Sequence, residues 1–446
     1  MSGVTRPPTD AEPLLRERDQ QACAQRKPVI DFASARGFAW GFVSQGFSSA
    51  TNFVLTLLAA RALGASGLGV VAVAFSSYLV ALGFQRAFIT DPLIANATTL
   101  GGKHRASATR NALTLSMAAG GSSALLVALA GVALSGPIGH GLLIVAVWIP
   151  VLVVQDFWRV VLFRDGRGRA AAFNDFVWLG AMVAAIPVAW SFRDEWAIIA
   201  AWGFGALVAA SVGWVQCGTR PGRVRLAVHW WRAAAWRLAR WLGATTVAHA
   251  VTTYATVFAL AALLGSAGYG GLRAVITVFA PLTLVGAAIA LPGLPALSRA
   301  LASSEREALR LAATLGVAAI VLTAGYVLSM YLTDGRIVPA IFGSSFGEFS
   351  DLVLPIGIGQ IAAAGAVGFI LLLTAQQRGS AVFVSTTVGT TASLVLASAL
   401  ASSQGEVGAA WGLSLGSVIG LMVTAALAGG VATARPARHS RRASQL

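Results

Sequence analysis

Several charged and amide side chains lie inside or at the ends of otherwise apolar stretches of this 446-residue chain. Charged groups are costly in such surroundings and mark functional sites by default. A guanidinium is planar and donates several hydrogen bonds at once, which suits it to a phosphate group. The pattern predicts a functional site, which we assign to substrate binding. Its candidate residues are Arg61, Arg86, Arg159, Arg273, Asn52, Gln155 and Gln360.

Each candidate also has a structural interpretation, which the sequence leaves open. Arg86 and Arg159 lie close to the ends of apolar stretches, where a long side chain can reach lipid head groups. Asp156 precedes Arg159 by three residues, a spacing that permits an ion pair. Arg61 and Arg273 lie at the rims of their stretches, where anchoring competes with binding. The three amides can instead join neighbouring helices by hydrogen bonds.

No motif in the chain indicates catalysis. The sequence has no HExxH, CxxC or phosphate-binding glycine loop, and Asp194-Glu195 fits a solvated turn. We therefore predict no catalytic residue, no metal site and no cofactor, and do not expect an enzyme. Cys23 and Cys217 have no metal-ligand spacing, and no disulfide is expected.

The composition places these residues in a membrane. The chain is 57% hydrophobic and 11% charged, with a mean hydropathy of +0.74, whereas soluble domains carry about 25% charged residues. Its apolar runs approach the ~20 residues that cross a bilayer. We predict an all-α integral membrane protein with about twelve spans. They cover 38–59, 68–90, 111–134, 138–162, 170–190, 196–217, 241–264, 270–297, 309–332, 350–373, 380–402 and 406–430.

Three repeated landmarks divide the spans into two sets of six. LGASGLG at 63–69 returns as LGSAGYG at 264–270, and Pro150-x4-Gln155 returns as Pro355-x4-Gln360. A basic break before a new apolar run, at 167–170, returns at 378–381. The repeats predict a duplication. Because each half has an even number of spans, both enter the membrane in the same direction. We expect two pseudo-symmetric six-helix lobes.

The duplication and the basic residues define the predicted domains. They are a disordered cytoplasmic tail (1–37), a first lobe (38–217), a cytoplasmic linker helix (218–240), a second lobe (241–430) and a basic cytoplasmic tail (431–446). In the linker, Arg225, His229, Arg232 and Arg240 share one helical face and most of its tryptophans the other. This pattern is typical of a helix lying in the membrane interface.

Basic residues predict the orientation. The segments assigned to the cytoplasm hold 26 of the 32 Lys and Arg, three of the other six lie on the opposite side, and three lie inside spans. This asymmetry follows the positive-inside rule, so both termini are expected in the cytoplasm. The net charge of +15 is then best explained by anionic membrane lipids, and no nucleic-acid partner is expected.

At this point the sequence resembles a known family. Asn52 to Gly69, Gln155-Asp156 with the arginine-rich turn after it, and Leu272-Arg273-Ala274 with Pro281 are similar to bacterial polysaccharide flippases. These are the O-antigen and capsule exporters of the multidrug/oligosaccharidyl-lipid/polysaccharide superfamily. The likeness covers about 38–430. It implies a location in the bacterial plasma membrane, and two lobes around a cavity lined mainly by spans 1, 2, 7 and 8. It also implies a cargo, a polyprenyl-diphosphate-linked oligosaccharide moved from the cytoplasmic to the outer leaflet.

Two other functions stay open at this stage. A cation-coupled multidrug exporter of the same superfamily needs a buried carboxylate in the first lobe's cavity. Spans 1 and 2 contain no Asp or Glu before Asp91, which favours an anionic cargo. A non-transporting scaffold for polysaccharide synthesis would leave the movement of lipid-linked sugar unchanged in its absence. Other polysaccharide-assembly proteins are further candidate partners, and a monomer suffices for a pathway between two lobes.

Overall fold

Helices account for the regular structure in the described part of the chain. The computed structural model describes residues 32–96, 102–333 and 336–433, and no strand occurs among them. Most of the two predicted tails lies outside the described residues. The helical core begins at Phe32, six residues before the predicted start of the first lobe at residue 38, and extends to Thr433.

The first half contains one long bent helix, four straight helices and a short connecting segment. The bent helix, α2, continues through the π-helical turn η1 into α3. The bounds are α2 Phe32–Gln85, η1 Arg86–Thr90, α3 Asp91–Asn96, α4 Gly102–Leu134, α5 Gly136–Arg164, α6 Gly168–Phe192 and α7 Glu195–Cys217.

The second half repeats this arrangement with more interruptions. Its first helix follows directly from the linker, and its last helix is bent like α2. The linker contains α8 Val224–Trp230 and η2 Trp231–Ala235. The bounds of the second half are α9 Trp236–Val278, α10 Leu282–Ser303, α11 Glu305–Tyr331, α12 Ile337–Phe342, η3 Ser344–Leu352, α13 Val353–Ala375 and α14 Gly379–Thr433.

The predicted number of spans agrees with these helices. In the described residues, nine helical stretches are long and apolar enough to cross a membrane. Two of them, in α2 and α14, each hold two predicted spans joined at a single non-helical glycine, Gly64 or Gly405. The remaining span is composed of the end of α9 and of α10. The predicted all-α, two-lobe membrane fold is therefore confirmed.

One predicted span is not continuous. The sequence analysis treats 270–297 as a single helix, but α9 ends at Val278 and α10 begins at Leu282. The intervening turn includes Pro281, which has no N–H to donate to a helix. The Tyr326 hydroxyl of α11 donates a 2.8 Å hydrogen bond to the Val278 carbonyl, and so satisfies a backbone group that the break sets free.

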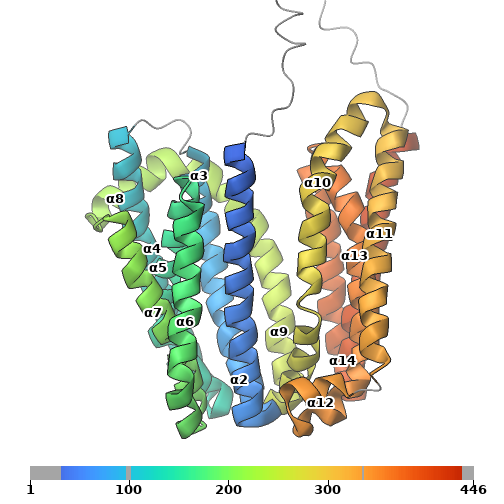
Figure 1. Ribbon diagram of the computed structural model, residues 1–446, viewed down its shortest axis with the longest axis horizontal. Coiled ribbons are helices and arrows are strands. Elements are labelled where there is room, and N and C mark those ends of the chain that lie inside the picture. The colour runs from blue at the N-terminus through green and yellow to red at the C-terminus, as the bar shows by residue number, and fades with distance from the viewer. Residues whose placement is uncertain (1–31, 97–101, 334–335, 434–446) are drawn as a thin grey trace, which may run out of the picture.

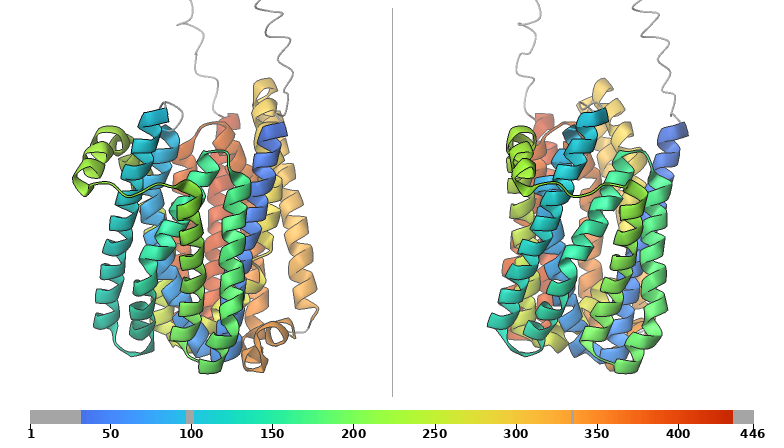
Figure 2. Two further views of the ribbon diagram at one scale, coloured as in Figure 1. Left: turned by 60° about the vertical axis from the view of Figure 1, so that its left-hand side comes forward. Right: turned by 90° about the vertical axis from the view of Figure 1, so that its left-hand side faces the viewer.

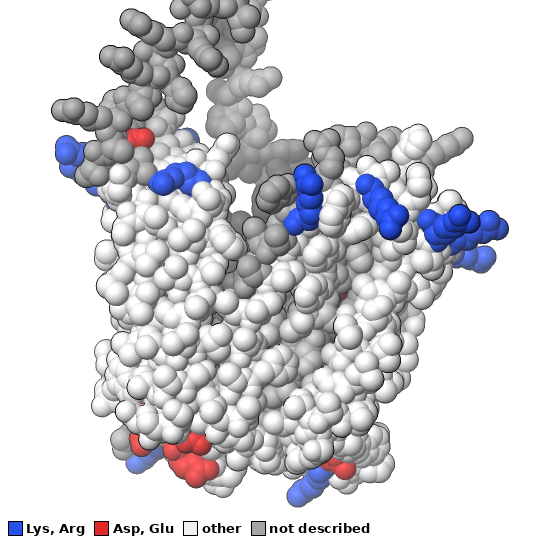
Figure 3. All heavy atoms as spheres, turned by 180° about the vertical axis from the view of Figure 1, so that it is seen from behind, with Lys and Arg blue, Asp and Glu red and all other residues white. Residues whose placement is uncertain are grey.

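The spans connect two ends of the molecule. At one end, which we call the terminal end, α2 begins and α14 finishes, and α3 and α8 lie nearby (Figures 1 and 2). At the other, the turn end, α2 and α9 bend and α12 lies across the second lobe (Figure 1). On the face in Figure 3, basic side chains gather at the terminal end.

The repeated glycine turns meet at the turn end. Gly64 and Gly265 have the same φ of 71°, with ψ near 180°, a conformation essentially restricted to glycine. A Cβ on Gly69 would lie 1.8 Å from the Ser266 carbonyl oxygen, and a Cβ on Gly270 would lie 1.8 Å from that of Ala65. The two turns thus pack backbone to backbone, which no larger residue permits.

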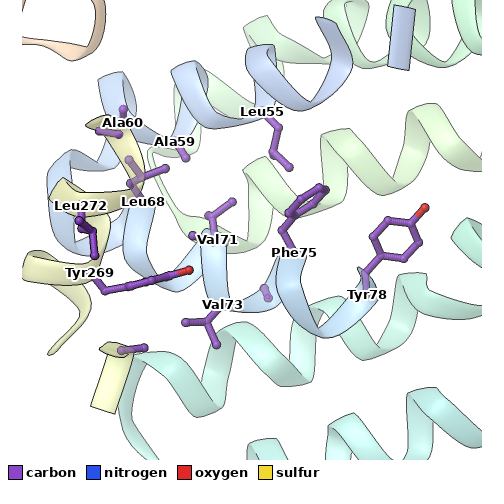
Figure 4. Close-up of a cluster of buried hydrophobic side chains, with 14 of the residues drawn as sticks. Leu55, Ala59, Ala60, Leu68, Val71, Val73, Phe75, Tyr78, Tyr269 and Leu272 are labelled. Atoms are coloured by element: carbon purple, nitrogen blue, oxygen red, sulfur yellow. The ribbon is translucent and has the colours of Figure 1, made fainter. Parts of the chain in front are cut away.

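The lobes also pack along α2 and α9. Figure 4 shows Tyr269 and Leu272 of α9 beside Ala60 and Leu68, which flank the bend in α2. All four residues are at most 3% exposed. Closely packed side chains of this kind leave no room for water, so the lobes are sealed together next to the turn end.

The linker is docked on the first lobe. Its backbone N–H at Gly222 donates to the Thr114 hydroxyl of α4 at 2.7 Å. The Trp231 indole donates to the Phe88 carbonyl at 2.8 Å, which joins the two π-helical turns. As the sequence predicts for an amphipathic segment, Arg225 and Arg232 are exposed and Trp231 is partly buried.

Candidate functional site

Arg86 and Asp156 form an ion pair inside the first lobe. Arg86 begins η1, and its Nε donates to Asp156 Oδ2 of α5 at 2.9 Å. A second bond joins its Nη2 to Oδ1. The Asp156 side chain is 3% exposed and that of Arg86 is 41% exposed. The arginine therefore neutralises a carboxylate that would otherwise be buried alone, which is energetically expensive.

Arg159 pairs with a carboxylate that the sequence analysis missed. Its Nε lies 3.2 Å from Oδ2 of Asp175 on α6, which is 1% exposed. The expected pairing of Arg159 with Asp156 is wrong, because Asp156 pairs with Arg86 instead. The spacing along α5 permitted the contact, but each aspartate finds its cation on another helix.

Asp175 is the centre of a buried hydrogen-bond network. Ser44 of α2 donates to its Oδ2, and Gln155 of α5 donates to its Oδ1 at 3.2 Å. Gln155 also donates to Asn174 at 3.1 Å, and Asn174 donates to the Ala209 carbonyl of α7 at 2.7 Å. Four helices are joined in this way. Gln155 therefore joins neighbouring helices by hydrogen bonds, as its structural interpretation predicts.

Arg61 connects the lobes at the turn end. It lies just before the bend in α2, and its Nε and Nη2 donate to the carbonyls of Ile341 and Ala340 at 2.8 and 2.7 Å. Both carbonyls are in the last turn of α12, where backbone acceptors lack helical partners and attract cations. Arg61 thus fastens the second lobe's α12 to the first lobe.

Arg273 differs from the other three arginines. Among the described residues it has no ion pair and no side-chain hydrogen bond; its guanidinium carbon lies 5.9 Å from the centre of the Phe75 ring of α2. A cation over an aromatic face gains a modest attraction, which leaves its N–H donors unused. Arg273 projects from the second lobe towards the first, and its N–H groups are available to bind an anion.

Two small cavities meet at Arg273. One, of about 10 Å³, lies against α2 and is lined by Asn52, Thr56 and Phe75. The other, of about 200 Å³, lies between α9 and α14. The structure thus brings Asn52 and Arg273 together, as a shared site requires. Gln360 of α13 lines neither cavity and makes no side-chain hydrogen bond to a described residue.

The buried carboxylates were detectable in the sequence. Asn174-Asp175 stands inside an apolar stretch, as the candidate arginines do, and the same criterion applied to acidic groups selects it. The search for a carboxylate in the first lobe considered only spans 1 and 2, whereas Asp156 and Asp175 come from spans 4 and 5. Both are paired with arginine, so neither is a free anion that would hold a cationic drug.

Solved structures of membrane transporters share this architecture. Lipid II flippase MurJ in an inward closed conformation is similar with a TM-score of 0.69 at 13% identity, over 89% of this chain and 88% of that one. An inward-facing multidrug resistance MATE transporter of the MOP superfamily is similar at 0.65 and 11%, over 87% and 94%. The chain has the fold of the MOP-superfamily transporters. No family model and no curated protein matches the sequence.

An outward-facing MATE structure of the MOP superfamily aligns over 90% of this chain and 95% of that one at 11% identity, with a TM-score of 0.55. This is lower than the inward-facing value of 0.65.

Proposed function

We propose that this protein is a flippase that moves a polyprenyl-diphosphate-linked oligosaccharide from the cytoplasmic to the outer leaflet of a bacterial plasma membrane. Arg273 carries the proposal, since it is the candidate arginine without a protein anion or carbonyl partner among the described residues. A diphosphate between the lobes supplies the acceptors that its N–H groups lack.

The fold supports a transport role for this site. Pseudo-symmetric lobes that meet at one end can rock about a central site and expose it to each side in turn. MurJ, which has this fold, is described as a lipid II flippase, so the fold can handle a lipid-linked substrate. The location in the plasma membrane, with both termini in the cytoplasm, remains part of this proposal.

Transport by reconstituted protein tests the proposal. Proteoliposomes would carry a fluorescent undecaprenyl-diphosphate disaccharide, and an impermeant quencher would report the fraction in each leaflet. We expect wild-type protein to move the lipid. One charge-assisted contact contributes about 1.5–3 kcal/mol, so Arg273→Gln should weaken binding about 10- to 100-fold. Arg273→Lys should retain part of the activity, because it keeps the charge.

Arg193→Gln is the matched control. Arg193 also lies over an aromatic ring, 5.8 Å from the centre of Trp190, but in the connection between α6 and α7 of the first lobe. Its loss should leave transport unchanged, and both variants should unfold near the wild-type temperature. Normal transport by a stable Arg273→Gln protein would refute the assignment of this residue to the site. Transport of a cationic dye but no lipid would favour the drug-exporter alternative.

A further inference from the structure

The cavity between α9 and α14 has an unusual lining beside Arg273. Its volume is about 200 Å³, which admits a single small ring rather than a chain of sugars. Hydroxyl-bearing residues line it: Thr253, Thr256 and Tyr269 of α9, and Thr390 and Ser393 of α14. Arg273 is the only charged residue among those that line it.

Most of these hydroxyls already donate their proton to a backbone carbonyl. Thr256 donates to the Thr252 carbonyl at 2.9 Å, and Thr390 donates to the Thr386 carbonyl at 3.0 Å. Ser393 donates to the Leu413 carbonyl at 3.4 Å. A hydroxyl has one proton but two acceptor lone pairs. Apart from the Arg273 guanidinium, the lining therefore offers a ligand acceptors and few donors.

One hydroxyl in the cavity has no partner among the described residues. The Oγ1 of Thr253 is buried and makes no hydrogen bond. A buried polar atom without a partner costs about 1–3 kcal/mol, and such atoms are rare in folded proteins. A ligand that hydrogen-bonds to Thr253 would relieve this cost.

The lining selects among ligand classes. A metal cation is disfavoured because no carboxylate lines the cavity and Arg273 repels positive charge. A second anion is disfavoured because the hydroxyl protons are committed to backbone carbonyls. A neutral group rich in O–H and N–H donors fits the acceptors. The apolar side chains of Val257, Leu260 and Ile276 suit the C–H faces of such a group.

From this lining and its position we infer that the cavity holds the sugar attached directly to the diphosphate, while Arg273 holds the diphosphate itself. The inference rests on the proposed function and deepens it, because it assigns the second lobe a part in recognising the sugar. It divides the site between an anion contact shared by all lipid diphosphates and a hydroxyl-lined cavity that distinguishes those with a sugar.

Two lipids that differ only in the sugar test the inference. The probes are undecaprenyl diphosphate and the same lipid carrying one N-acetylhexosamine, with dissociation constants measured on the full-length protein in nanodiscs. Thr253→Val keeps the side-chain shape and removes the unpartnered hydroxyl, so the fold should be at least as stable as wild type. We expect three- to tenfold weaker binding of the sugar-bearing lipid, the effect of one hydrogen bond, and unchanged binding of the bare diphosphate.

The controls separate the inference from the function on which it depends. Thr314→Val removes an exposed hydroxyl of α11 that donates to the Arg310 carbonyl, and should change neither affinity. Arg273→Gln should weaken both lipids alike. If Thr253→Val affects both lipids equally, or neither, the sugar assignment is overturned while the flippase proposal stands. If wild-type protein binds neither lipid, the proposed function itself fails, and the sugar assignment fails with it.

Discussion

Gly69 and Gly270 hold equivalent places in the two repeated turns, and each lies against the other's turn. The Cβ that either glycine lacks would fall 1.8 Å from a carbonyl oxygen of the opposite turn. The contact is reciprocal, as expected where two similar halves meet across a pseudo-two-fold axis. The repeat therefore has a physical purpose: small residues let the two backbones approach closely at the turn end.

A disulfide across the turns should lock this end shut. The hydroxyls of Ser66 and Ser266 lie 2.8 Å apart, so cysteines at both positions can approach the ~2.05 Å of a disulfide bond. In a protein with Cys23 and Cys217 replaced by serine, we expect oxidation of the pair to abolish transport and reduction to restore it. The measurement is lipid movement with and without reductant. Full transport by the oxidised, crosslinked protein would show that this end does not open.

Alanine at either glycine should hold the same end open. Gly69→Ala and Gly270→Ala place a methyl group where a carbonyl lies, so the turns must separate. We expect the Ser66–Ser266 cysteine pair to crosslink at least tenfold more slowly in either variant. Gly83→Ala on α2 is the control, because no atom lies within 4 Å of the added Cβ. Equal crosslinking rates in all three variants would contradict the close packing.

Arg61→Gln should weaken the closed state without unfolding either lobe. It removes two charged hydrogen bonds to the end of α12. Because Arg61 is exposed, we expect a cost of only about 1 kcal/mol, or roughly fivefold in the population of the closed state. The rate at which a cysteine at Ser66 reacts with a soluble thiol reagent reports this shift. Arg336→Gln, an exposed arginine at the same end, should change the rate little.

Arg159 should act through stability rather than through substrate binding. Asp175→Asn leaves the largely buried Arg159 without its ion pair, and breaking one side of such a pair costs about 3 kcal/mol. Thermal unfolding in detergent should show the loss for Asp175→Asn and for Arg159→Gln. The double variant should be more stable than the two separate losses predict. A strictly additive double variant, with transport lost at normal stability, would instead place Arg159 in the substrate site.

The predicted orientation can be tested by labelling. Single cysteines at Gly139 and Asp194 lie at the turn end and should react with an impermeant thiol reagent outside intact cells. Cysteines at Ser107 and Arg223 should react only after the membrane is opened, because the excess of arginine assigns their end to the cytoplasm. Labelling of Arg223→Cys in intact cells would show that the orientation is the opposite of the predicted one. The predicted direction of transport would then be reversed as well.

Local patterns in the sequence predict the spans and the bends, but not the contacts between them. Gly64 and Gly265 are recognisable because a repeated turn has a repeated spacing. The partners of the arginines are not recognisable: Arg86 and Asp156 are 70 residues apart, and Arg61 meets a carbonyl 280 residues away. An arginine at the rim of a span has the same sequence pattern whether it anchors, pairs or binds substrate. Only the packing of the helices separates Arg273 from the rest.

The break in span 8 illustrates the same limit. Pro281 marks a position where a helix bends, yet a proline alone does not distinguish a kink from a gap of three residues. Tyr326 stabilises the gap here, because its hydroxyl donates a hydrogen bond to the Val278 carbonyl that the gap exposes. That contact depends on the packing of α11 against the break.

The contact between Trp231 and the Phe88 carbonyl determines where the polypeptide can be divided into two fragments that still assemble. The linker stands between the two lobes in sequence, but this bond and the approach of Gly243 to the Phe88 ring tie the linker and the start of α9 to the first lobe. Two fragments separated between Thr219 and Gly222 would each keep one surface of this joint and could reassemble in a cell that makes both. Fragments separated after Ala235 would leave α9 without the Trp231 hydrogen bond. The linker thus provides a contact through which the two halves can recognise each other.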